Sequence, residues 1–310
     1  MKRPINTAAV VLAAVLALTG CTPTSGASTS PVPSPSATLN LPADLTAPGA
    51  AKTVLDALVA ATGSSSVVRA EVTKATASVS VLVKDEVRTW SYRDGAIKQS
   101  ASELAMSEQT PFSLTGFALD NVGELFRLAG AVSGSTKDQQ LQVTVYSAGK
   151  ILMTVTTVPE TKTVFFEPSG VLVPVLDFGT QAGITAGLAD VIGATTTATS
   201  VVVSSAQGVT MDSPSTQRIS VRWHRAASVP TTSVQRSDNT TGVTVFDPHR
   251  VTPQAIWGVL ERTRAAGTYR YGDAWTVTVD DRERSGTPTM RFEVGGRTFT
   301  TDLFGVEITR

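Results

Sequence analysis

The spacing of apolar residues changes repeatedly along the chain between residue 44 and the C-terminus. In four segments apolar side chains recur at i, i+3, i+4 and i+7, as at Ala51, Val54, Leu55 and Leu58, which places them on one face of an α-helix. Between those segments apolar and polar residues alternate, and this predicts strands with one apolar face. Helices are therefore predicted over residues 46–62, 120–133, 180–192 and 252–266, each followed by three or four strands.

Short turn sequences separate the predicted strands. Residues 94–95, 149–150 and 295–296 each contain glycine between two extended runs, a pattern typical of antiparallel hairpins. One apolar residue from each predicted helix gives a nearly constant period, since Leu55, Phe126, Ile192 and Leu260 follow one another at intervals of 71, 66 and 68 residues. This period predicts an α+β fold of tandem modules, each with one helix packed on a three- to four-stranded antiparallel sheet.

The period also predicts the domain organisation. We expect a first α+β pair of modules over residues 44–178 and a second pair over residues 179–310. One helix covers one face of a sheet, so the bare faces of two modules are expected to pack together or to line up into one long concave sheet. This arrangement resembles the tandem helix-plus-sheet modules of the PepSY-like and β-lactamase-inhibitor-protein-like groups. The resemblance covers most of the folded body and is one of architecture.

The N-terminus carries the pattern of an export signal. Lys2 and Arg3 precede an unbroken apolar run over residues 8–18, which is shorter than the roughly 18 residues that a membrane span requires. The sequence Leu-Thr-Gly-Cys then ends at Cys21, the only cysteine in the chain. This resembles the bacterial lipobox. The resemblance implies a signal peptide over residues 1–20, diacylglycerol and palmitate on Cys21, and an anchor on the extracytoplasmic face of the cell membrane.

Residues 21–43 are predicted to form a disordered tether between the lipidated cysteine and the folded body. Of the 22 residues from 22 to 43, 14 are Ser, Thr or Pro and none is charged. Such a segment buries too little apolar area to offset the entropy of ordering, and we expect it to hold the body clear of the membrane. The composition, rich in Ala, Val and Thr, resembles that of actinobacterial proteins.

Charge and composition exclude several classes of partner and cofactor. Lys plus Arg and Asp plus Glu both number 26, so no overall positive field draws the chain to nucleic acid. One Cys and two His leave no disulfide scaffold within the chain and argue against a Cys/His metal site. The sequence contains neither a P-loop nor a G-x-G-x-x-G motif. We therefore predict no cofactor and no metal.

The search for catalytic motifs finds only fragments. Ser147 and Lys150 match the S-x-x-K motif of penicillin-binding proteins and residues 237–239 match S-D-N, but the third motif, K-T-G, is missing. Ser147 also lies in a predicted hairpin turn, whereas the motif requires the start of a buried helix. The alternating charges of residues 280–284 favour a solvated hairpin loop over a pair of catalytic carboxylates. We therefore predict no catalytic residues and no enzymatic activity.

Six aromatic residues make up the candidate binding surface. Aromatic side chains most often fill a core or its rim, and the alternative is an exposed patch on an uncovered sheet face. The six residues are Trp90, Tyr92, Trp223, Tyr269, Tyr271 and Trp275.

Three functions are consistent with these features. The favoured one is a membrane-anchored binding or scaffold protein of the cell envelope, whose partner is another envelope protein or a cell-wall polymer. The second is a carrier of a lipid or glycolipid, similar to the mycobacterial lipoproteins that shuttle glycolipids, and it requires a cavity. The third is an envelope enzyme of an unrecognised type, which requires a pocket with a strongly perturbed carboxylate or His. The cavity of a carrier would be lined by residues such as Leu125, Phe126, Phe165, Leu172 and Val175.

Overall fold

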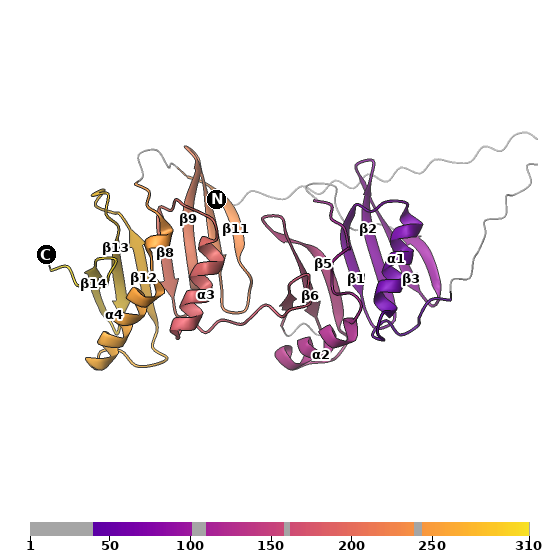
Figure 1. The fold of residues 1–310 in the computed structure, drawn as a ribbon, viewed down its shortest axis with the longest axis horizontal. Helices are drawn as coiled ribbons and strands as arrows, with labels where there is room; N and C mark the ends of the chain where they lie inside the picture. The colour runs from indigo at the N-terminus through magenta and orange to yellow at the C-terminus, as the bar shows by residue number, and fades with distance from the viewer. Residues whose placement is uncertain (1–39, 101–109, 158–161, 239–243, 310) are drawn as a thin grey trace, which may run out of the picture. The chain divides into compact units, whose positions relative to one another are not determined.

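The computed structural model describes residues 40–100, 110–157, 162–238 and 244–309. Residues 38–310 belong to one compact unit. The described part contains four α-helices, a short 3₁₀ helix and fourteen strands in two antiparallel sheets (Figure 1). The prediction of a mixed α+β fold with antiparallel sheets is therefore confirmed.

The elements divide into two halves, each with two α-helices and seven strands, and the C-terminal half also contains the 3₁₀ helix. The N-terminal half contains α1 (Ala50–Thr62), β1 (Val67–Val72), β2 (Thr76–Val83), β3 (Glu86–Arg93), β4 (Ala96–Ser100), α2 (Val122–Ser133), β5 (Gln140–Ser147), β6 (Lys150–Thr156) and β7 (Val164–Phe166). The C-terminal half contains α3 (Gln181–Ile192), β8 (Ser200–Ser204), β9 (Gly208–Thr216), β10 (Ile219–Arg225), β11 (Thr232–Ser237), η1 (Pro248–Arg250), α4 (Pro253–Ala265), β12 (Trp275–Asp280), β13 (Thr289–Val294) and β14 (Arg297–Thr301).

The predicted module of one helix on three or four strands is wrong in its boundaries. β1 pairs with β5 and β8 pairs with β12, so each half is one seven-stranded sheet, in the orders β4-β3-β2-β1-β5-β6-β7 and β11-β10-β9-β8-β12-β13-β14. A separate module would leave β1 and β5 as edges with unpaired backbone N–H and C=O groups, and their pairing satisfies those groups. The structural repeat therefore spans two of the predicted periods.

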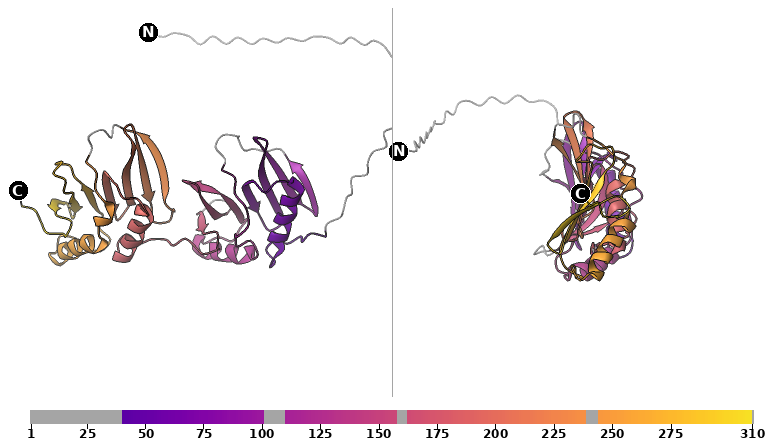
Figure 2. Two further views of the ribbon diagram at one scale, coloured as in Figure 1. Left: turned by 45° about the horizontal axis from the view of Figure 1, so that its top comes forward. Right: turned by 90° about the vertical axis from the view of Figure 1, so that its left-hand side faces the viewer.

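Both helices of each half cover the same face of their sheet (Figure 2). In the N-terminal half, Val54 of α1 and Leu125 of α2 share one core with Val79 of β2 and Met153 of β6. Because side chains alternate across a strand, this face takes every second residue and the opposite face takes the rest. The sheet therefore has one apolar face under the helices and a second face that none of the described helices covers.

The helices begin and end largely where the sequence predicts them, and two glycines in or beside them have specific roles. The N-cap of α1 is Gly49, whose φ is 74°, and not Thr46, whose hydroxyl donates to Asp44 at 2.6 Å. The glycines that interrupt α3 have a packing role. A Cβ on Gly183 would lie 1.9 Å from the Asp177 carbonyl oxygen, so glycine allows the preceding segment to pack closely on the helix.

The two halves repeat the same turn after their last strand. Gly170 follows β7 and Gly305 follows β14, and both have a φ of 84°. The amide of Gly170 donates to the Glu167 carbonyl at 2.8 Å, and that of Gly305 donates to Asp302 at 3.1 Å. The two turns are 135 residues apart in the sequence, which supports a repeat of half the folded body.

Candidate functional site

The face of the N-terminal sheet that no helix covers is lined mainly by polar side chains. In β2 it carries Ser78, which is half-buried, and Ser80, which is 5% exposed and lies 2.8 Å from Thr89 Oγ1, whereas Ala77 and Val79 face the core. The register pairs Ser78 with Ser91 of β3 and Ser80 with Thr89, so hydroxyl groups continue from strand to strand across the sheet. A face of this kind is suited to hydrogen bonding with a polar ligand.

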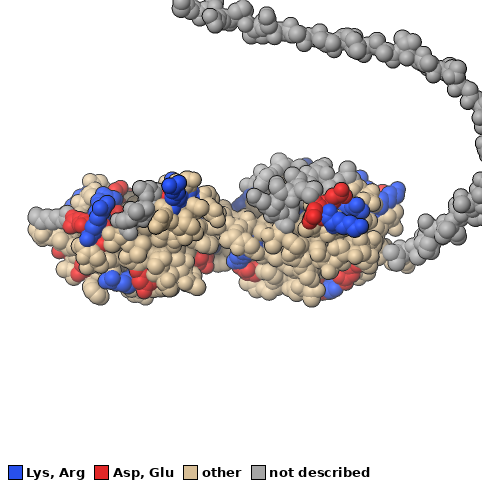
Figure 3. Space-filling view, turned by 90° about the horizontal axis from the view of Figure 1, so that it is seen from above, with Lys and Arg blue, Asp and Glu red and all other residues tan. Residues whose placement is uncertain are grey.

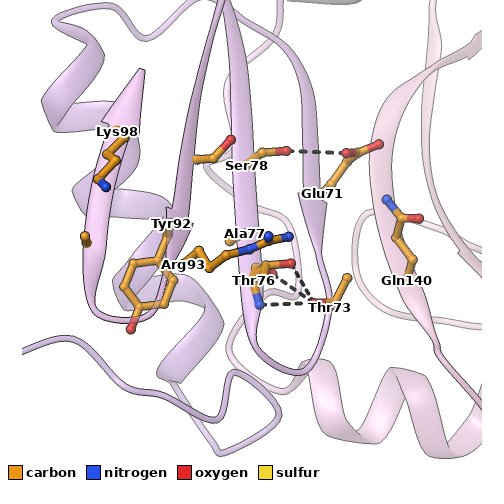
Figure 4. A pocket seen from close by; sticks show the side chains of 11 residues that line it. Glu71, Thr73, Thr76, Ala77, Ser78, Tyr92, Arg93, Lys98 and Gln140 are labelled. Carbon is orange, nitrogen blue, oxygen red and sulfur yellow. Dashed lines mark hydrogen bonds between the residues drawn. The ribbon is translucent and has the colours of Figure 1, made fainter. Parts of the chain in front are cut away.

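A pocket of about 400 Å³ opens on this face (Figure 4). It lies over β1 to β5, near the turn that connects β1 and β2, and its lining combines hydroxyl, amide and charged groups. The lining residues are Glu71, Thr73, Thr76, Ala77, Ser78, Ser91, Tyr92, Arg93, Ala96, Lys98 and Gln140.

The carboxylate of Glu71 is already held by its neighbours on the sheet. It forms an ion pair with Arg69 of the same strand. Gln142 Nε2 donates to Glu71 Oε1 at 3.0 Å, and Ser78 Oγ donates to Oε2 at 3.4 Å (Figure 4). Both oxygens are therefore engaged, and this carboxylate is compensated rather than free to act as a base.

The two cations on the other side of the pocket have no such compensation. Arg93 at the end of β3 and Lys98 in β4 are exposed, and neither forms an ion pair with any residue in the described ranges. The Arg93 side chain extends from β3 across β2 toward Thr76 (Figure 4). A guanidinium in this position presents hydrogen-bond donors to whatever occupies the pocket.

The corresponding face of the C-terminal sheet is different at its centre, where the cation Arg222 is paired. Arg222 Nε and Nη2 donate to Asp212 Oδ1 and Oδ2, both at 2.7 Å. This bidentate contact raises the pKa of Arg222, and Ser200 Oγ also donates to Asp212 at 3.2 Å. Thr210 Oγ1 lies 2.9 Å from Nδ1 of His224. Arg236 of the edge strand β11, opposite Ser220, is exposed and has no ion pair among the described residues.

A second polar centre lies inside the C-terminal half and is structural. Arg225 is 0% exposed, and its Nε donates to Asp190 Oδ2 of α3 at 2.8 Å. Nη1 donates to Val229 O at 2.7 Å and to the carbonyl oxygen of Ala226, and Nη2 donates to Pro174 O at 2.8 Å. This buried cation therefore ties the segment before α3 to the end of β10.

In the N-terminal half, too, a buried side chain donates to a backbone carbonyl of the segment that precedes the first helix. Tyr92, the partner of Ala77, is 1% exposed, and its hydroxyl donates to the Pro42 carbonyl at 2.8 Å. Leu41 packs on the same core. The last residues of the predicted 21–43 tether therefore belong to the folded body, because Leu41 and the Pro42 carbonyl have partners there.

The structure distributes the six aromatic residues of the candidate binding surface between two cores. Tyr92 and Trp275 are buried, and Trp90 packs against the N-terminal core as Trp223 does against the C-terminal core. Tyr269 is 4% exposed and Tyr271 is 65% exposed. The Tyr271 hydroxyl donates to Asp177 at 3.1 Å, and this hydrogen bond raises the pKa of the phenol. The six side chains therefore do not gather on one surface.

The residues named for a lipid-carrier cavity also separate. Leu125 and Phe126 lie in the N-terminal core, with Leu172 packed against it. Phe165 lies between Val164 and Phe166, which face the core, so its own side chain lies on the opposite face of the sheet, where its ring makes an edge contact with Tyr146. Val175 is 53% exposed. These five side chains do not line one cavity.

The fragments of catalytic motifs lie on strand ends. Ser147 and Lys150 are paired residues where β5 and β6 meet, and Lys150 forms an ion pair with Glu167 at 3.0 Å. Ser237 is the last residue of β11, and Asn239 lies outside the described residues. Asp281 accepts hydrogen bonds from the amides of Ser285 and Gly286 and thus stabilises the predicted hairpin loop.

The described part of the chain contains neither a metal-binding cluster nor a membrane-spanning helix. Within the described ranges no three His, Cys, Asp or Glu side chains gather closely enough to hold a metal ion. In the same part of the chain no helix is both long and apolar enough to cross a bilayer. The predicted signal peptide over residues 1–20 and the predicted lipidation site Cys21 lie outside the described residues.

Comparison with known proteins places the chain in no family. No protein-family model matches the sequence, and no curated protein matches it. A functional assignment therefore depends on the N-terminal sequence and on the polar pocket.

Proposed function

We propose that this chain is a lipid-anchored, non-catalytic binding protein of the cell envelope that presents the polar face of its N-terminal sheet to a partner. The observation that carries the proposal is the pocket at Arg93 and Lys98, where two cations without an ion-pair partner among the described residues lie among hydroxyl groups. Unpaired donors of this kind are suited to recognition of a polar partner, whereas the groups that most often act as general bases are imidazole and carboxylate. The only carboxylate in the lining, Glu71, is held by Arg69, Gln142 and Ser78.

Support for the anchor comes from the sequence. A short charged segment, an apolar run over residues 8–18 and a single cysteine at position 21 occur in the order that lipoprotein processing requires. Two acyl chains hold a protein stably on a membrane, whereas one chain gives marginal binding. A binding protein attached in this way would meet ligands outside the cytoplasmic membrane.

The anchor is tested by labelling growing cells with palmitate and fractionating them. We expect wild-type chain to carry the label and to sediment with membranes, and the Cys21→Ser variant to lose both properties. The matched control is Ser25→Ala, a change in the same Ser/Thr/Pro segment that leaves the cysteine intact. Wild-type chain without label, or a mature N-terminus other than Cys21, refutes the anchor.

Binding is tested separately with the full chain in detergent and with envelope fragments stripped of lipid. We expect the chain to co-sediment with this material, and the double variant Arg93→Gln/Lys98→Gln to remain in the supernatant. Arg236→Gln is a suitable control, because this exposed arginine lies on β11, far from the pocket in the sequence and in the other sheet. Stoichiometric co-purified lipid instead of co-sedimentation would favour the carrier function.

A further inference from the structure

A second pocket continues the first one around the end of the N-terminal sheet. It has a volume of about 800 Å³ and lies between the β1–β2 turn and α2. Both pockets are lined by Thr73, Thr76, Arg93 and Gln140, so they form one continuous depression, which we call the Arg93 groove. The second pocket is also lined by Thr46, Lys74, Ala75, Gly123, Phe126, Arg127, Thr136, Asp138 and Gln139.

The charged groups along the Arg93 groove are unevenly compensated. Its lining contains the cations Lys74, Arg93, Lys98 and Arg127 and the carboxylates Glu71 and Asp138. Arg127 is paired with Glu124, Lys74 lies 3.8 Å from Asp44, and Glu71 is paired with Arg69. Among the described residues Arg93 and Lys98 are thus the groove cations without an ion pair, as Asp138 is the carboxylate without one, and Arg93 is the cation that both pockets share. Basic and acidic side chains are interspersed on the surface seen from above (Figure 3), and the chain has 26 of each, so attraction depends on this local pair and not on a general field.

The uncharged part of the lining combines hydroxyl and amide groups with apolar side chains such as Phe126 and Ala75. Four threonines, two serines and the amides of Gln139 and Gln140 offer both donors and acceptors. Gln139 Nε2 donates to the Phe126 carbonyl at 2.6 Å, and Thr73 Oγ1 lies 2.7 Å from Thr76 Oγ1, so these groups are held in place by the fold. Preformed donors and acceptors of this kind match the hydroxyl groups of a sugar.

We propose that the Arg93 groove binds a strand of an acidic glycan, a sugar polymer that bears carboxylate or phosphate groups. Arg93 would pair with one anionic group at the middle of the groove, because a planar guanidinium contacts carboxylate or phosphate through two parallel hydrogen bonds. Lys98 lines one arm beyond Arg93, and Thr136 and Gln139 line the other. A groove that continues on both sides of its central cation suits a polymer better than a single small anion. This inference rests on the proposed binding function and names the ligand of the same site.

The experiment titrates the full chain, held in detergent, with three polymers of similar length. Polygalacturonate carries carboxylates, poly(glycerol phosphate) carries phosphates, and dextran is neutral. We expect one or both anionic polymers to bind at least tenfold more tightly than dextran, with an affinity that falls as salt is raised. The two anionic polymers distinguish a carboxylate ligand from a phosphate ligand.

Variants of the groove locate the binding. Arg93→Gln is expected to weaken binding of the preferred polymer by tenfold or more, whereas Arg93→Lys keeps the charge without the two-pronged geometry and loses less. Arg236→Gln, the matched control on the other sheet, is expected to bind as the wild-type chain does. Because Arg93 is exposed, each variant is expected to keep the near-ultraviolet circular dichroism of the wild-type chain.

Three outcomes overturn the proposal. If dextran binds as tightly as the anionic polymers, recognition does not depend on charge. If Arg93→Gln binds the polymers as the wild-type chain does, the binding site is not the Arg93 groove. Failure of all three polymers, together with Arg93-dependent capture of an envelope protein, assigns the site to a protein partner. In that last case the proposed binding function stands and the glycan is refuted. Failure of palmitate labelling at Cys21 refutes the anchor alone.

Discussion

Replacing Arg225 by methionine tests how the C-terminal half holds the segment that leads into it. Methionine keeps most of the volume of the stem and removes every donor of the guanidinium. The side chain is 0% exposed, and it donates to the carbonyls of Pro174 and Val229 at 2.8 and 2.7 Å. The variant removes these hydrogen bonds, and because a hydrogen bond to a charged group contributes about 1.5–3 kcal/mol, losing the two should cost about 3–5 kcal/mol.

The two partners of the ion pair differ in exposure, so removing one is not equivalent to removing the other. Asp190, the acidic partner at 2.8 Å, is 47% exposed, so water solvates its carboxylate when the arginine is removed. Asp190→Asn instead leaves the buried guanidinium without its counter-charge, and we expect it to cost about 3 kcal/mol. Tyr92→Phe, which removes the hydroxyl donor to Pro42 in the N-terminal half, is expected to cost about 1 kcal/mol.

Urea denaturation and amide hydrogen exchange measure the two consequences. Denaturation reports the free energy of unfolding, and exchange at Leu176 reports the segment directly, because its amide donates to the Ala227 carbonyl at 2.9 Å. We expect Arg225→Met to lower the free energy of unfolding by about 3–5 kcal/mol and to abolish protection of the Leu176 amide. A loss below about 1 kcal/mol with Leu176 still protected would show that the buried cation does not hold this segment.

Three further predictions concern single positions. Gly208→Ala is expected to lower the free energy of unfolding in urea by about 2–5 kcal/mol, because φ is 86° and the new Cβ would lie 2.1 Å from the Arg225 carbonyl oxygen. The control Gly296→Ala, with a φ of 75° and open space around it, should cost about 1 kcal/mol, and equal losses in the two variants would contradict the steric argument. Asp281→Ala removes the acceptor of two backbone amides in the following turn and should lower the free energy of unfolding by about 1–2 kcal/mol. Amide hydrogen exchange should become faster in that loop alone, and unchanged exchange there would exclude the capping role of Asp281. Burial raises the pKa of Tyr269, so the folded state favours the neutral phenol, and the free energy of unfolding should fall as the pH rises above the pKa of about 10 that tyrosine has in the unfolded chain. Measured from pH 8 to 11, this fall should be shallower in Tyr269→Phe, and an identical pH dependence in the two proteins would refute the assignment.

Much of the secondary structure could be predicted because it depends on neighbours in the sequence. The spacing of Val54, Leu55 and Leu58 predicts a helix whichever sheet it packs on, and the structure has α1 there. Thr252 before Pro253 predicts the start of α4, where Thr252 Oγ1 accepts a hydrogen bond from the Ala255 amide at 3.3 Å. Helix caps and hairpin turns are local arrangements, so the residues that form them are visible together in the sequence.

The candidate site could be predicted only in part. Alternation in β2 and β3 shows that Ser78, Ser91 and Arg93 lie off the apolar positions, and this is the signal that could have found the polar face. Sequence reasoning instead selected aromatic residues such as Trp90 and Tyr92, which the structure places in or against the core. A polar position on a strand is exposed, covered by a loop or paired, and the sequence does not distinguish these cases.

The sequence alone determined the class of elements, their order and the lipobox-like motif at Cys21, because periodicity and a linear motif need no knowledge of distant contacts. Only the tertiary structure decided that β1 pairs with β5 and β8 with β12, since these partners lie far apart in the chain and their registers depend on the packing of both helices on one face. The same holds for Arg225, whose partners come from three separate segments, and for Arg93, whose lack of a partner among the described residues depends on where every neighbouring strand lies.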